Sequence, residues 1–494
     1  MSVFSDALSQ LIDRKKIKVY DMIRYLEIDR STMYQIIKGK RNPPADSQIE
    51  KMADFMLLTP SEREELLEQA KITRTGKNIY YQRKGVAQFM CGFPDSPSED
   101  KPGPGQPFDL FAPEPDKLQE YADEADKIEY LPTEYDVHHV IRRLLQKEAL
   151  KENSLICLQL QPEENFLFDM LRSMVPAGSL KVEQILCISN KDEMADEHTV
   201  LNIRYLNTII PLYVRSNAEY KAYYYYDNVE SHFFHNNIFP GMILTAESAL
   251  LLAADYSSAM VIHSRDTLEA LKSMFEKTKE NCRELFNVAE VNMMDFSQIQ
   301  QANDAVTDKV ACYIMEREVC LLPLLTKDIL VEYLHPAIPG RDMMVESLAV
   351  MLQGNRAMLD SMNMHLYFTQ DGLEYFAKTG KFKELPDEIY IPLKPEDRIR
   401  MLNDVKEYCK RGIYRMMSGQ LSHLAKNLRL CINGNLGYLM FTEENGKVIY
   451  MFLTEPSLLF MFRDFIENVE EKDFAPNDAT DAVIGKVCAE IDKE

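Results

Sequence analysis

A run of proline and glycine divides the chain into two unequal blocks, and it limits what the chain can fold into more than any other feature. Residues 92–116 contain seven prolines and three glycines in 25 positions. Proline fixes φ and lacks a backbone donor, so neither a long helix nor a central strand can pass through such a run. We therefore interpret it as a linker between a short N-terminal block and a long C-terminal block.

The block before the linker has the spacing of short amphipathic helices. Apolar residues recur at helical intervals in two successive stripes: Phe4, Leu8, Leu11 and Ile12, then Val19, Met22, Ile23 and Leu26. A third helix is expected after Asp29 or Ser31, either of which can cap it, and a fourth near residues 47–56. Thr59-Pro-Ser-Glu has capping-box form and begins a fifth. This block is predicted to be entirely α-helical.

A tight turn separates the second and third of these helices within Tyr20–Pro44, YDMIRYLEIDRSTMYQIIKGKRNPP. Over about the first 70 residues, this spacing resembles the Cro/repressor-type, lambda repressor-like helix-turn-helix of the XRE family of transcriptional regulators. Residues at the family's apolar sites are Ile28, Met33 and Ile36, and Gly39-Lys-Arg-Asn-Pro matches the loop that ends its recognition helix. The chain departs from the family at two positions, Ile23 and Glu27, where the family prefers Ala and Gly.

The resemblance implies that the third helix enters the major groove of double-stranded DNA, where base edges meet side chains near the helix N-terminus. Arg30, Ser31 and Gln35 would then reach bases, supported by Thr32 and Tyr34. Three further cations would neutralise phosphate: Lys38, Lys40 and Arg41. The alternative is that all of these are ordinary solvated residues of a helix and a basic loop.

The distribution of charge favours nucleic-acid contact at this end of the chain only. Residues 1–90 carry 16 Lys/Arg and 12 Asp/Glu, whereas the remaining residues carry 40 and 66. Such an acidic remainder repels phosphate. A second basic stretch, residues 71–84, is interpreted either as an arm that touches the DNA backbone or as a solvated extension.

The long acidic block mixes helical and strand-like spacing. A capping box at Thr133 predicts an amphipathic helix, and further helices are expected near residues 165–172 and 267–279. Apolar runs predict strands at residues 155–160, 182–188, 209–214, 222–226, 249–253 and 259–263. The fold class is therefore a multidomain chain with an all-α N-terminal domain and a large α/β or α+β C-terminal region.

An internal similarity indicates that the C-terminal region contains two related lobes. Residues 264–275 and 454–465 share the form [ST]-x-x-[ST]-L-x-x-[LM]-x-x-x-F, each after a predicted pair of strands. Chance similarity between strand-to-helix junctions is the alternative. The paired lobes also resemble the phospholipase-D-like domains of some regulators that sense sugars, although no H-x-K-x-x-x-x-D motif is present.

The sequence lacks the familiar signatures of nucleotide binding and hydrolysis: G-x-x-x-x-G-K-[ST], G-x-G-x-x-G, H-E-x-x-H and G-x-S-x-G. We therefore predict no catalytic residues, no cofactor and no metal. His232 and His235 have a spacing that a metal can use, but regularly placed Cys or carboxylate partners are missing. Crevices between lobes bind small molecules, so the lobes are expected to sense an effector.

Together these features predict four segments: a helix-turn-helix domain at residues 1–72, a basic extension and linker at 73–116, and sensor lobes at 117–290 and 291–494. The expected function is that of a sequence-specific DNA-binding transcriptional regulator of bacterial type. Its expected partners are an operator in double-stranded DNA, a small-molecule effector and a second copy in a homodimer. The alternative is an enzyme or scaffold that uses the helix-turn-helix for docking or autoregulation.

The expected location of the protein is the cytoplasm. Nine cysteines without a C-x-x-C pair are typical of reduced core residues. The N-terminus lacks the uninterrupted apolar region of a signal peptide. The longest apolar run, residues 249–254, is much shorter than the ~18 to 20 residues that span a bilayer. No membrane contact is expected.

Overall fold

The computed structural model divides the chain into two compact units, Met1–Gly85 with Asp192–Val200 and Val86–Lys191 with Leu201–Glu494. The predicted linker, apart from its first two residues, lies outside the part of the chain that the structure describes, and so does the His232/His235 pair. The described residues are 2–93, 128–162, 166–189, 200–215, 217–229, 237–291, 311–361, 363–381, 389–442 and 448–493.

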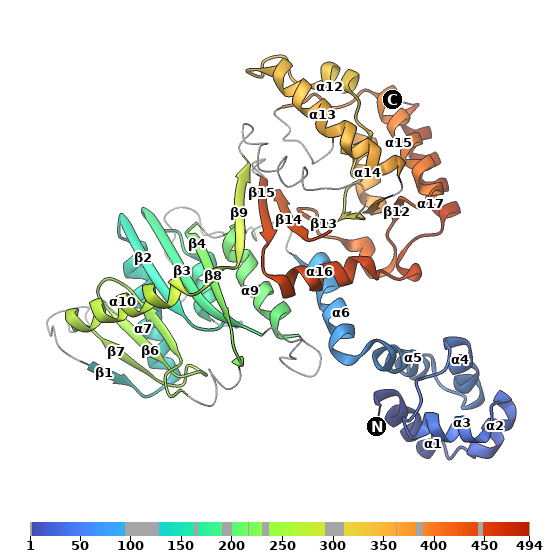
Figure 1. Ribbon diagram of the computed structural model, residues 1–494, viewed down its shortest axis with the longest axis horizontal. Helices are drawn as coiled ribbons and strands as arrows, with labels where there is room; N and C mark the ends of the chain where they lie inside the picture. The colour runs from blue at the N-terminus through green and yellow to red at the C-terminus, as the bar shows by residue number, and fades with distance from the viewer. Residues whose placement is uncertain are drawn as a thin grey trace. The chain divides into compact units, whose positions relative to one another are not determined.

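The first unit is helical, as the sequence predicts (Figure 1). Its helices are α1 (Val3–Arg14), α2 (Val19–Leu26), α3 (Arg30–Ile37), α4 (Asp46–Phe55), α5 (Pro60–Thr75) and the start of α6 (Lys77–Gly92). The two predicted apolar stripes supply much of one shared core, in which Phe4, Leu8, Met22 and Met33 are fully buried. The predicted capping box is present, because the Thr59 and Glu62 side chains each accept a hydrogen bond from the other residue's backbone N–H.

The basic stretch at residues 71–84 is helical in the structure and occupies the end of α5 and the first half of α6. The Tyr80 hydroxyl donates a hydrogen bond to Glu68 Oε1 at 2.6 Å, which fastens α6 to α5. The last residues of α6 belong to the second unit, where Met90 O accepts a hydrogen bond from the Ala425 N–H at 2.9 Å.

The second unit contains two mixed sheets, and the first has the order β1-β7-β6-β5-β2-β3-β4-β8. Strands β2, β3 and β4 run parallel, and the other neighbours pair antiparallel. The strands are β1 (Ile128–Leu131), β2 (Asn153–Gln159), β3 (Ser179–Ile188), β4 (Glu219–Tyr226), β5 (Gly241–Leu244), β6 (Ala249–Leu252), β7 (Ala259–Ile262) and β8 (Arg283–Glu284).

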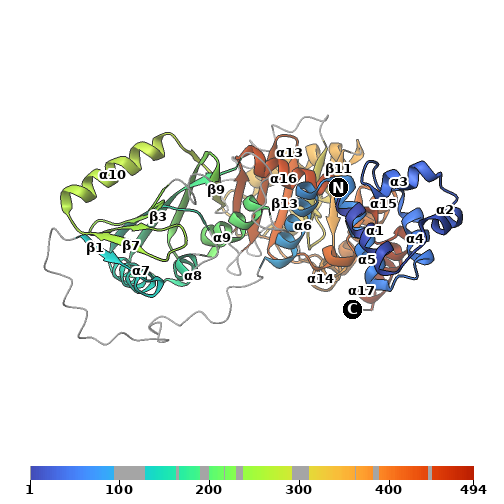
Figure 2. The ribbon, with the colours of Figure 1, turned by 90° about the horizontal axis from the view of Figure 1, so that it is seen from below.

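Helices cover both faces of this sheet. Figure 2 shows α10 on one face and α7 and α8 on the other. The helices are α7 (Glu134–Ala149), α8 (Phe166–Ser173), α9 (Leu201–Arg215) and α10 (Arg265–Glu280). The strand predicted at residues 209–214 is wrong, because these residues lie in α9. Ile209, Ile210 and Leu212 are all buried there, and a helix that is apolar on most sides gives the same continuous apolar run as a buried strand.

The second sheet has the order β12-β11-β10-β13-β14-β15-β9. Its strands are β9 (Phe286–Val291), β10 (Cys312–Glu316), β11 (Met364–Phe368), β12 (Tyr414–Met416), β13 (Leu428–Asn433), β14 (Leu436–Thr442) and β15 (Val448–Leu453). Its helices are η3 (Leu322–Leu324), α12 (Lys327–Tyr333), α13 (Arg341–Asp360), α14 (Gln370–Thr379), α15 (Pro395–Lys410), η4 (Gly419–His423), α16 (Pro456–Glu467), η5 (Glu471–Asp473) and α17 (Asn477–Ile491). The core joins one sheet face to residues of α12 through α15 and α17.

The two sheets share one topology. From β9 the second sheet has the order β9-β15-β14-β13-β10-β11-β12, which matches β1-β7-β6-β5-β2-β3-β4 of the first. Each antiparallel meander ends in a strand that is followed by a helix, α10 or α16. The similar residues 264–275 and 454–465 fall at these two junctions, and Leu268 and Leu458 are buried at matching positions. The two lobes thus have the same strand order and the same junction motif.

The break between the lobes falls earlier than residue 291. Strand β9 pairs with β15 of the second sheet along Phe286–Val291, while Arg283 and Glu284 of β8 pair with β4 of the first. A strand's partner is set by residues far away in the sequence, so local spacing does not locate such a boundary.

Candidate nucleic-acid interface

Helix α3 begins and ends at residues that fix its position. At its start, Asp29 Oδ2 accepts a hydrogen bond from the Thr32 N–H at 3.0 Å, which caps the helix as predicted. At its end, the Lys40 N–H donates to Gln35 O at 2.8 Å across Gly39, which has a φ of +65°. These contacts make α3 two turns long and place the basic loop directly beyond it.

Gly39 is required by close packing as well as by its backbone conformation. A Cβ added to Gly39 would lie 2.7 Å from Ser5 Oγ and 2.8 Å from Ser2 N. Ser5 is fully buried in the first turn of α1. The loop after α3 therefore lies against the start of α1, and only glycine fits both the left-handed φ and the available space.

The side chains predicted to contact DNA lie together on the outside of α3. Met33 and Ile36 point into the core, whereas the other face is exposed and consists of Arg30, Ser31, Tyr34, Gln35 and Lys38. Lys40 and Arg41 are exposed in the following loop, and Thr32 is half-buried. The structure thus brings all eight predicted residues to one helix and its adjoining loop.

Two contacts organise this surface internally. The Arg30 guanidinium carbon lies 5.7 Å from the centroid of the Tyr34 ring, one helical turn further along. Arg41 Nη1 donates a hydrogen bond to Thr32 Oγ1 at 3.1 Å, so the loop folds back on the first turn of α3. The two residues predicted to act in support, Thr32 and Tyr34, are therefore the ones that hold arginines.

Several cations elsewhere in the helical unit are paired with acids of α4 and α5. Arg14 and Lys15 bind Glu62 at 2.7 and 3.0 Å. The hydrogen bond from the Thr59 N–H and the contact with Lys15 hold the pKa of the Glu62 carboxyl below its ordinary value. Three further pairs follow the same pattern: Arg63 with Glu50 and Asp54, Arg74 with Asp46, and Lys84 with Glu68.

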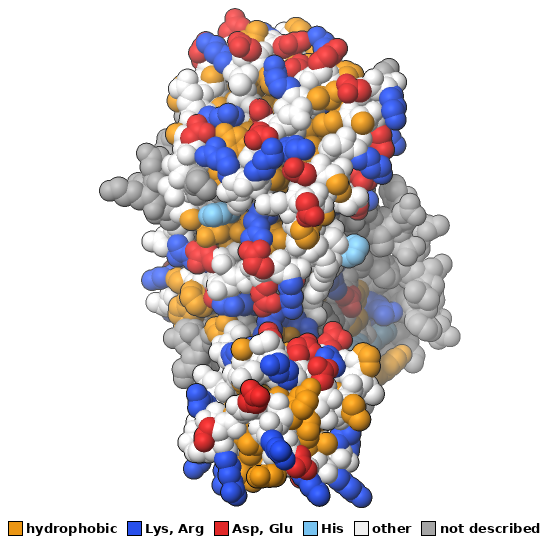
Figure 3. All heavy atoms as spheres, turned by 90° about the vertical axis from the view of Figure 1, so that its right-hand side faces the viewer, with side chains coloured by type: hydrophobic (Ala, Val, Ile, Leu, Met, Phe, Trp, Pro, Cys, Tyr) orange, Lys and Arg blue, Asp and Glu red, His pale blue; other side chains and the backbone are white. Residues whose placement is uncertain are grey.

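The predicted DNA-facing cations are different. Within the described residues, no ion pair joins Arg30, Lys38, Lys40 or Arg41 to an acid. In Figure 3, Lys and Arg side chains project from the lower rim of the helical unit. Arg30, Lys38, Lys40 and Arg41 thus leave their charge unpaired on α3 and its loop, whereas several acids of α4 and α5 are paired with other cations.

Helix α2 adds exposed side chains that the sequence analysis did not select. Lys18 is the N-cap residue, and Tyr20 and Arg24 follow it on the exposed side of the helix. Tyr20 is 68% exposed, which is unusual for a large ring. Their helical spacing from the buried Met22 and Leu26 was the available signal.

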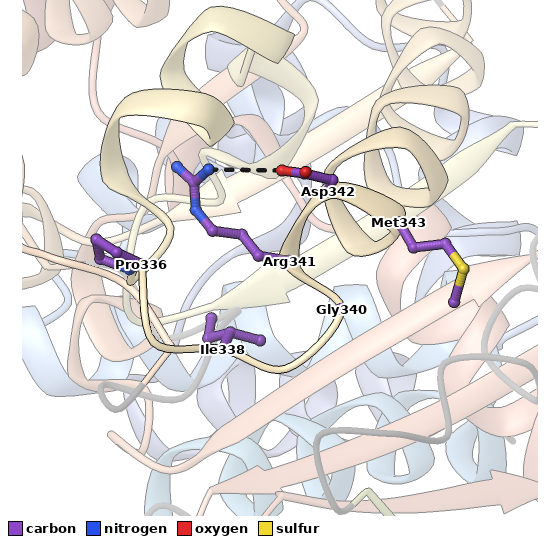
Figure 4. A pocket seen from close by; sticks show the side chains of 6 residues that line it. All are labelled: Pro336, Ile338, Gly340, Arg341, Asp342 and Met343. Atoms are coloured by element: carbon purple, nitrogen blue, oxygen red, sulfur yellow. Dashed lines mark ion pairs between the residues drawn. The ribbon is translucent and has the colours of Figure 1, made fainter.

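A hollow of about 560 Å³ lies in the second unit beside the loop that precedes α13 (Figure 4). Arg341 lines it, but its guanidinium is engaged in the fold, because Nε donates to Leu334 O at 3.1 Å and Nη2 donates to Val331 O. These bonds satisfy carbonyls at the end of α12. Asp342 is exposed, and its Oδ1 atom lies 3.9 Å from Arg341 Nη1.

Polar and aromatic contacts join the two lobes. The Tyr226 hydroxyl of the first lobe donates to Glu455, a fully buried N-cap residue of α16, and Asn202 Nδ2 donates to Ser457 Oγ at 3.3 Å. Burial and the Glu455 carboxylate raise the pKa of Tyr226. The adjoining cavity, lined by Asn202 and Leu458, measures about 10 Å³, which is the space of a single water.

No group of His, Cys, Asp and Glu suited to a metal ion occurs among the described residues. Within those residues, too, every helix falls short of the length and apolar character needed to cross a membrane.

Comparisons with known proteins do not identify the chain. No protein family and no curated protein matches it. Among solved structures, the archaeal chromatin protein TrmBL2, described as showing a novel mode of DNA binding, aligns at 11% identity over 52% of this chain and 84% of its own, with a TM-score of 0.21. Polyphosphate kinase from Porphyromonas gingivalis aligns at 13% identity over 74% of this chain and 56% of its own, also with a TM-score of 0.21. At these TM-scores neither likeness establishes a fold or a function.

Proposed function

We propose that α2, the turn at residues 27–29 and α3 form a helix-turn-helix of the XRE type, and that the chain is a sequence-specific transcriptional regulator rather than an enzyme. The observation that carries the proposal is the separation of charge in the helical unit. Acids neutralise several cations of α1, α5 and α6, among them Arg14, Arg74 and Lys84, whereas within the described residues no ion pair joins the exposed cations of α3 and its loop to an acid. An unpaired arginine at the start of α3 suits base edges in the major groove, and unpaired cations at its end and in the following loop suit a phosphate backbone.

The residues then divide into two roles. The Arg30 guanidinium carries paired donors, and the Gln35 amide carries a donor and an acceptor; both arrangements match base edges. Ser31 follows Arg30 near the start of α3. Lys38 and Lys40 neutralise phosphates beyond the helix. Arg41 keeps donors free for a phosphate after its bond to Thr32, because a guanidinium has five.

A homodimer is part of the proposal. A single module of this size offers too little surface for strong specificity, and helix-turn-helix proteins read two half-sites about 34–36 Å apart. A chain with one such helical unit therefore needs a second copy to read a palindromic operator.

The two lobes are proposed to receive an effector. Their acidic balance opposes phosphate binding, so a role beyond DNA contact is expected of them. An effector that distinguishes the DNA-binding state must change operator affinity, and DNA must change effector affinity by the same factor. Thermal-shift screening of the full chain against metabolites tests this. A ligand that raises the melting temperature without changing operator affinity would contradict the coupling.

Replacing Arg30 or Gln35 by Ala tests the DNA-binding proposal directly. Each change should weaken binding to a site selected from random DNA by about 1 to 3 kcal/mol, with little loss on unrelated sequences. Fluorescence anisotropy on both DNAs measures the difference. Lys51→Ala is the matched control, because Lys51 is an exposed cation of α4 outside the proposed interface. Equal losses on both DNAs would refute base readout.

A further inference from the structure

Arg30 is held by an aromatic ring rather than by an acid. Its guanidinium carbon lies 5.7 Å from the Tyr34 ring centroid, and both side chains are exposed on the same face of α3. Asp29, the neighbouring acid in sequence, accepts a hydrogen bond from the Thr32 N–H and forms no ion pair with Arg30 within the described residues. Of the unpaired cations on α3 and its loop, Arg30 is the one for which such a ring contact is recorded among those residues.

The choice of a ring has a chemical consequence. A carboxylate would position the guanidinium but would occupy its donors and cancel its charge. An aromatic face attracts the cation through the quadrupole of the ring and leaves the planar edge with its N–H donors free. That edge is what binds O6 and N7 of guanine in the major groove.

Restricting the Arg30 side chain also reduces the conformational entropy that is lost on binding DNA. An exposed arginine has several rotatable bonds, and each must be fixed when its guanidinium forms two parallel hydrogen bonds. Tyr34 is anchored to the same helix, one turn away, so the ring restricts Arg30 before DNA arrives. The cap at Asp29 and the bond between Arg41 and Thr32 fix the first turn of α3 in addition.

We propose that Tyr34 is a positioning residue that determines specificity, because it orients the Arg30 guanidinium to read a guanine in the major groove. This inference rests on the proposed function. It assigns the ring of Tyr34, and not its hydroxyl, to the role, since no hydrogen bond of that hydroxyl occurs in the described residues. It further states that the preferred site contains a G·C pair whose recognition depends on both residues.

The test uses the full chain and double-stranded DNA selected from a random pool by the wild-type protein. Affinities are then measured for the selected site and for its single base-pair variants. Tyr34→Phe should leave the preferences unchanged, whereas Tyr34→Leu should reduce the preference for guanine at one position by about two- to fivefold. All other positions should keep their preferences. Arg30→Ala should abolish the preference at that same position.

The double variant separates positioning from a general effect on folding. In the Arg30→Ala background, Tyr34→Leu should cause no further change at the guanine, because the group it orients is missing. A loss of equal size in both backgrounds, or an equal loss on all sequences, would overturn the inference. A selected site whose preferences ignore Tyr34→Leu would overturn it while leaving the proposed function intact. Failure to select any sequence would overturn both.

Discussion

Arg30 in the helical unit and Arg429 in the seven-stranded sheet lie in opposite electrostatic surroundings. Arg30 is exposed, and its recorded contact is with the face of Tyr34. Arg429 is 5% exposed and lies opposite Glu316 across β13 and β10. Its Nε and Nη2 atoms donate to the two Glu316 oxygens at 2.9 and 2.7 Å. One guanidinium is available to a ligand, and the other is used inside the fold.

The difference shows which charges a fold can leave free. A buried charge must be compensated in place, because removing an ion from water costs several kcal/mol in a protein interior. An exposed charge remains hydrated and needs no partner. Cations that stay unpaired at the surface, while acids nearby are used by other cations, therefore mark the better candidate for an interface.

Arg429→Met should have the largest effect on stability. It leaves the Glu316 carboxylate buried without its cation, which typically destabilises a protein by about 3 to 5 kcal/mol. The change is measured as a lower denaturant midpoint for the transition of the second unit. The double variant Arg429→Met with Glu316→Leu should recover most of the loss. If the single and double variants unfold alike, the pair is not what stabilises this part of the sheet.

Gly39→Ala should have the next largest effect on stability. A left-handed alanine costs roughly 1 to 2 kcal/mol, and the added Cβ would also overlap Ser5 Oγ and Ser2 N. Gly340→Ala is the matched control, because Gly340 also has a left-handed φ, +71°, but a Cβ there meets nothing within 4 Å. Melting of the helical unit should drop for Gly39→Ala by more than the control lowers melting of the second unit. Equal decreases in melting temperature would mean that the loop after α3 can shift to accommodate the added Cβ.

Neutralising Lys38, Lys40 and Arg41 together should change how DNA binding depends on salt. Each lost phosphate contact reduces the slope of log K against log[salt] by about 0.9, so the triple variant should lower it by about 2 to 3. Binding to specific and unrelated DNA should weaken alike. Lys51→Gln should leave the slope unchanged. A triple variant with the wild-type slope would remove these residues from phosphate contact.

The smallest expected effect is on the pH dependence of stability. The pKa of Glu62 is lowered first by the hydrogen bond from the Thr59 N–H and then by Lys15. A lowered carboxyl pKa contributes stability above the ordinary value of 4.5, and this contribution is lost as the pH falls through the folded-state pKa. Glu62→Gln should therefore lower the melting temperature at neutral pH, and the difference from wild type should shrink as the pH falls below 4.5 and through the folded-state pKa. Glu64→Gln, at an exposed neighbouring carboxylate, is the control.

Most elements with a strong period could be predicted from the sequence. The capping box at Thr59 depends on contacts within a few residues. Burial leaves a visible apolar spacing in the stripes of α1 and α2 and in the strands β2, β3 and β4. The strand predicted at residues 209–214 was wrong, because an apolar run fits a buried strand and a buried helix equally well. The basic stretch at 71–84 gave no clear period, and its helix is stabilised by packing, such as that of Tyr80 on Glu68.

The residues of the candidate site could be predicted, but their contacts could not. Spacing placed Arg30, Gln35 and Lys38 on the outside of one helix, because Met33 and Ile36 must face inward. The exposed Tyr20 of α2 was not selected, although its spacing from the buried Met22 and Leu26 places it on the outside of the helix.

Part of the local order of this protein follows from its sequence: the starts of capped helices such as α3 and α5, which side chains of α3 stay outside, and the form shared by two junctions 190 residues apart. The tertiary structure alone decided what depends on distant partners. It set the matching strand orders of the two sheets, the place of β9 in the second, and the pairing of Arg63, Arg74 and Lys84 with acids while Arg30 stays free of them. The physical reason is range: capping and periodicity act over a few residues, whereas strand pairing and ion pairs join residues that only the folded chain brings together.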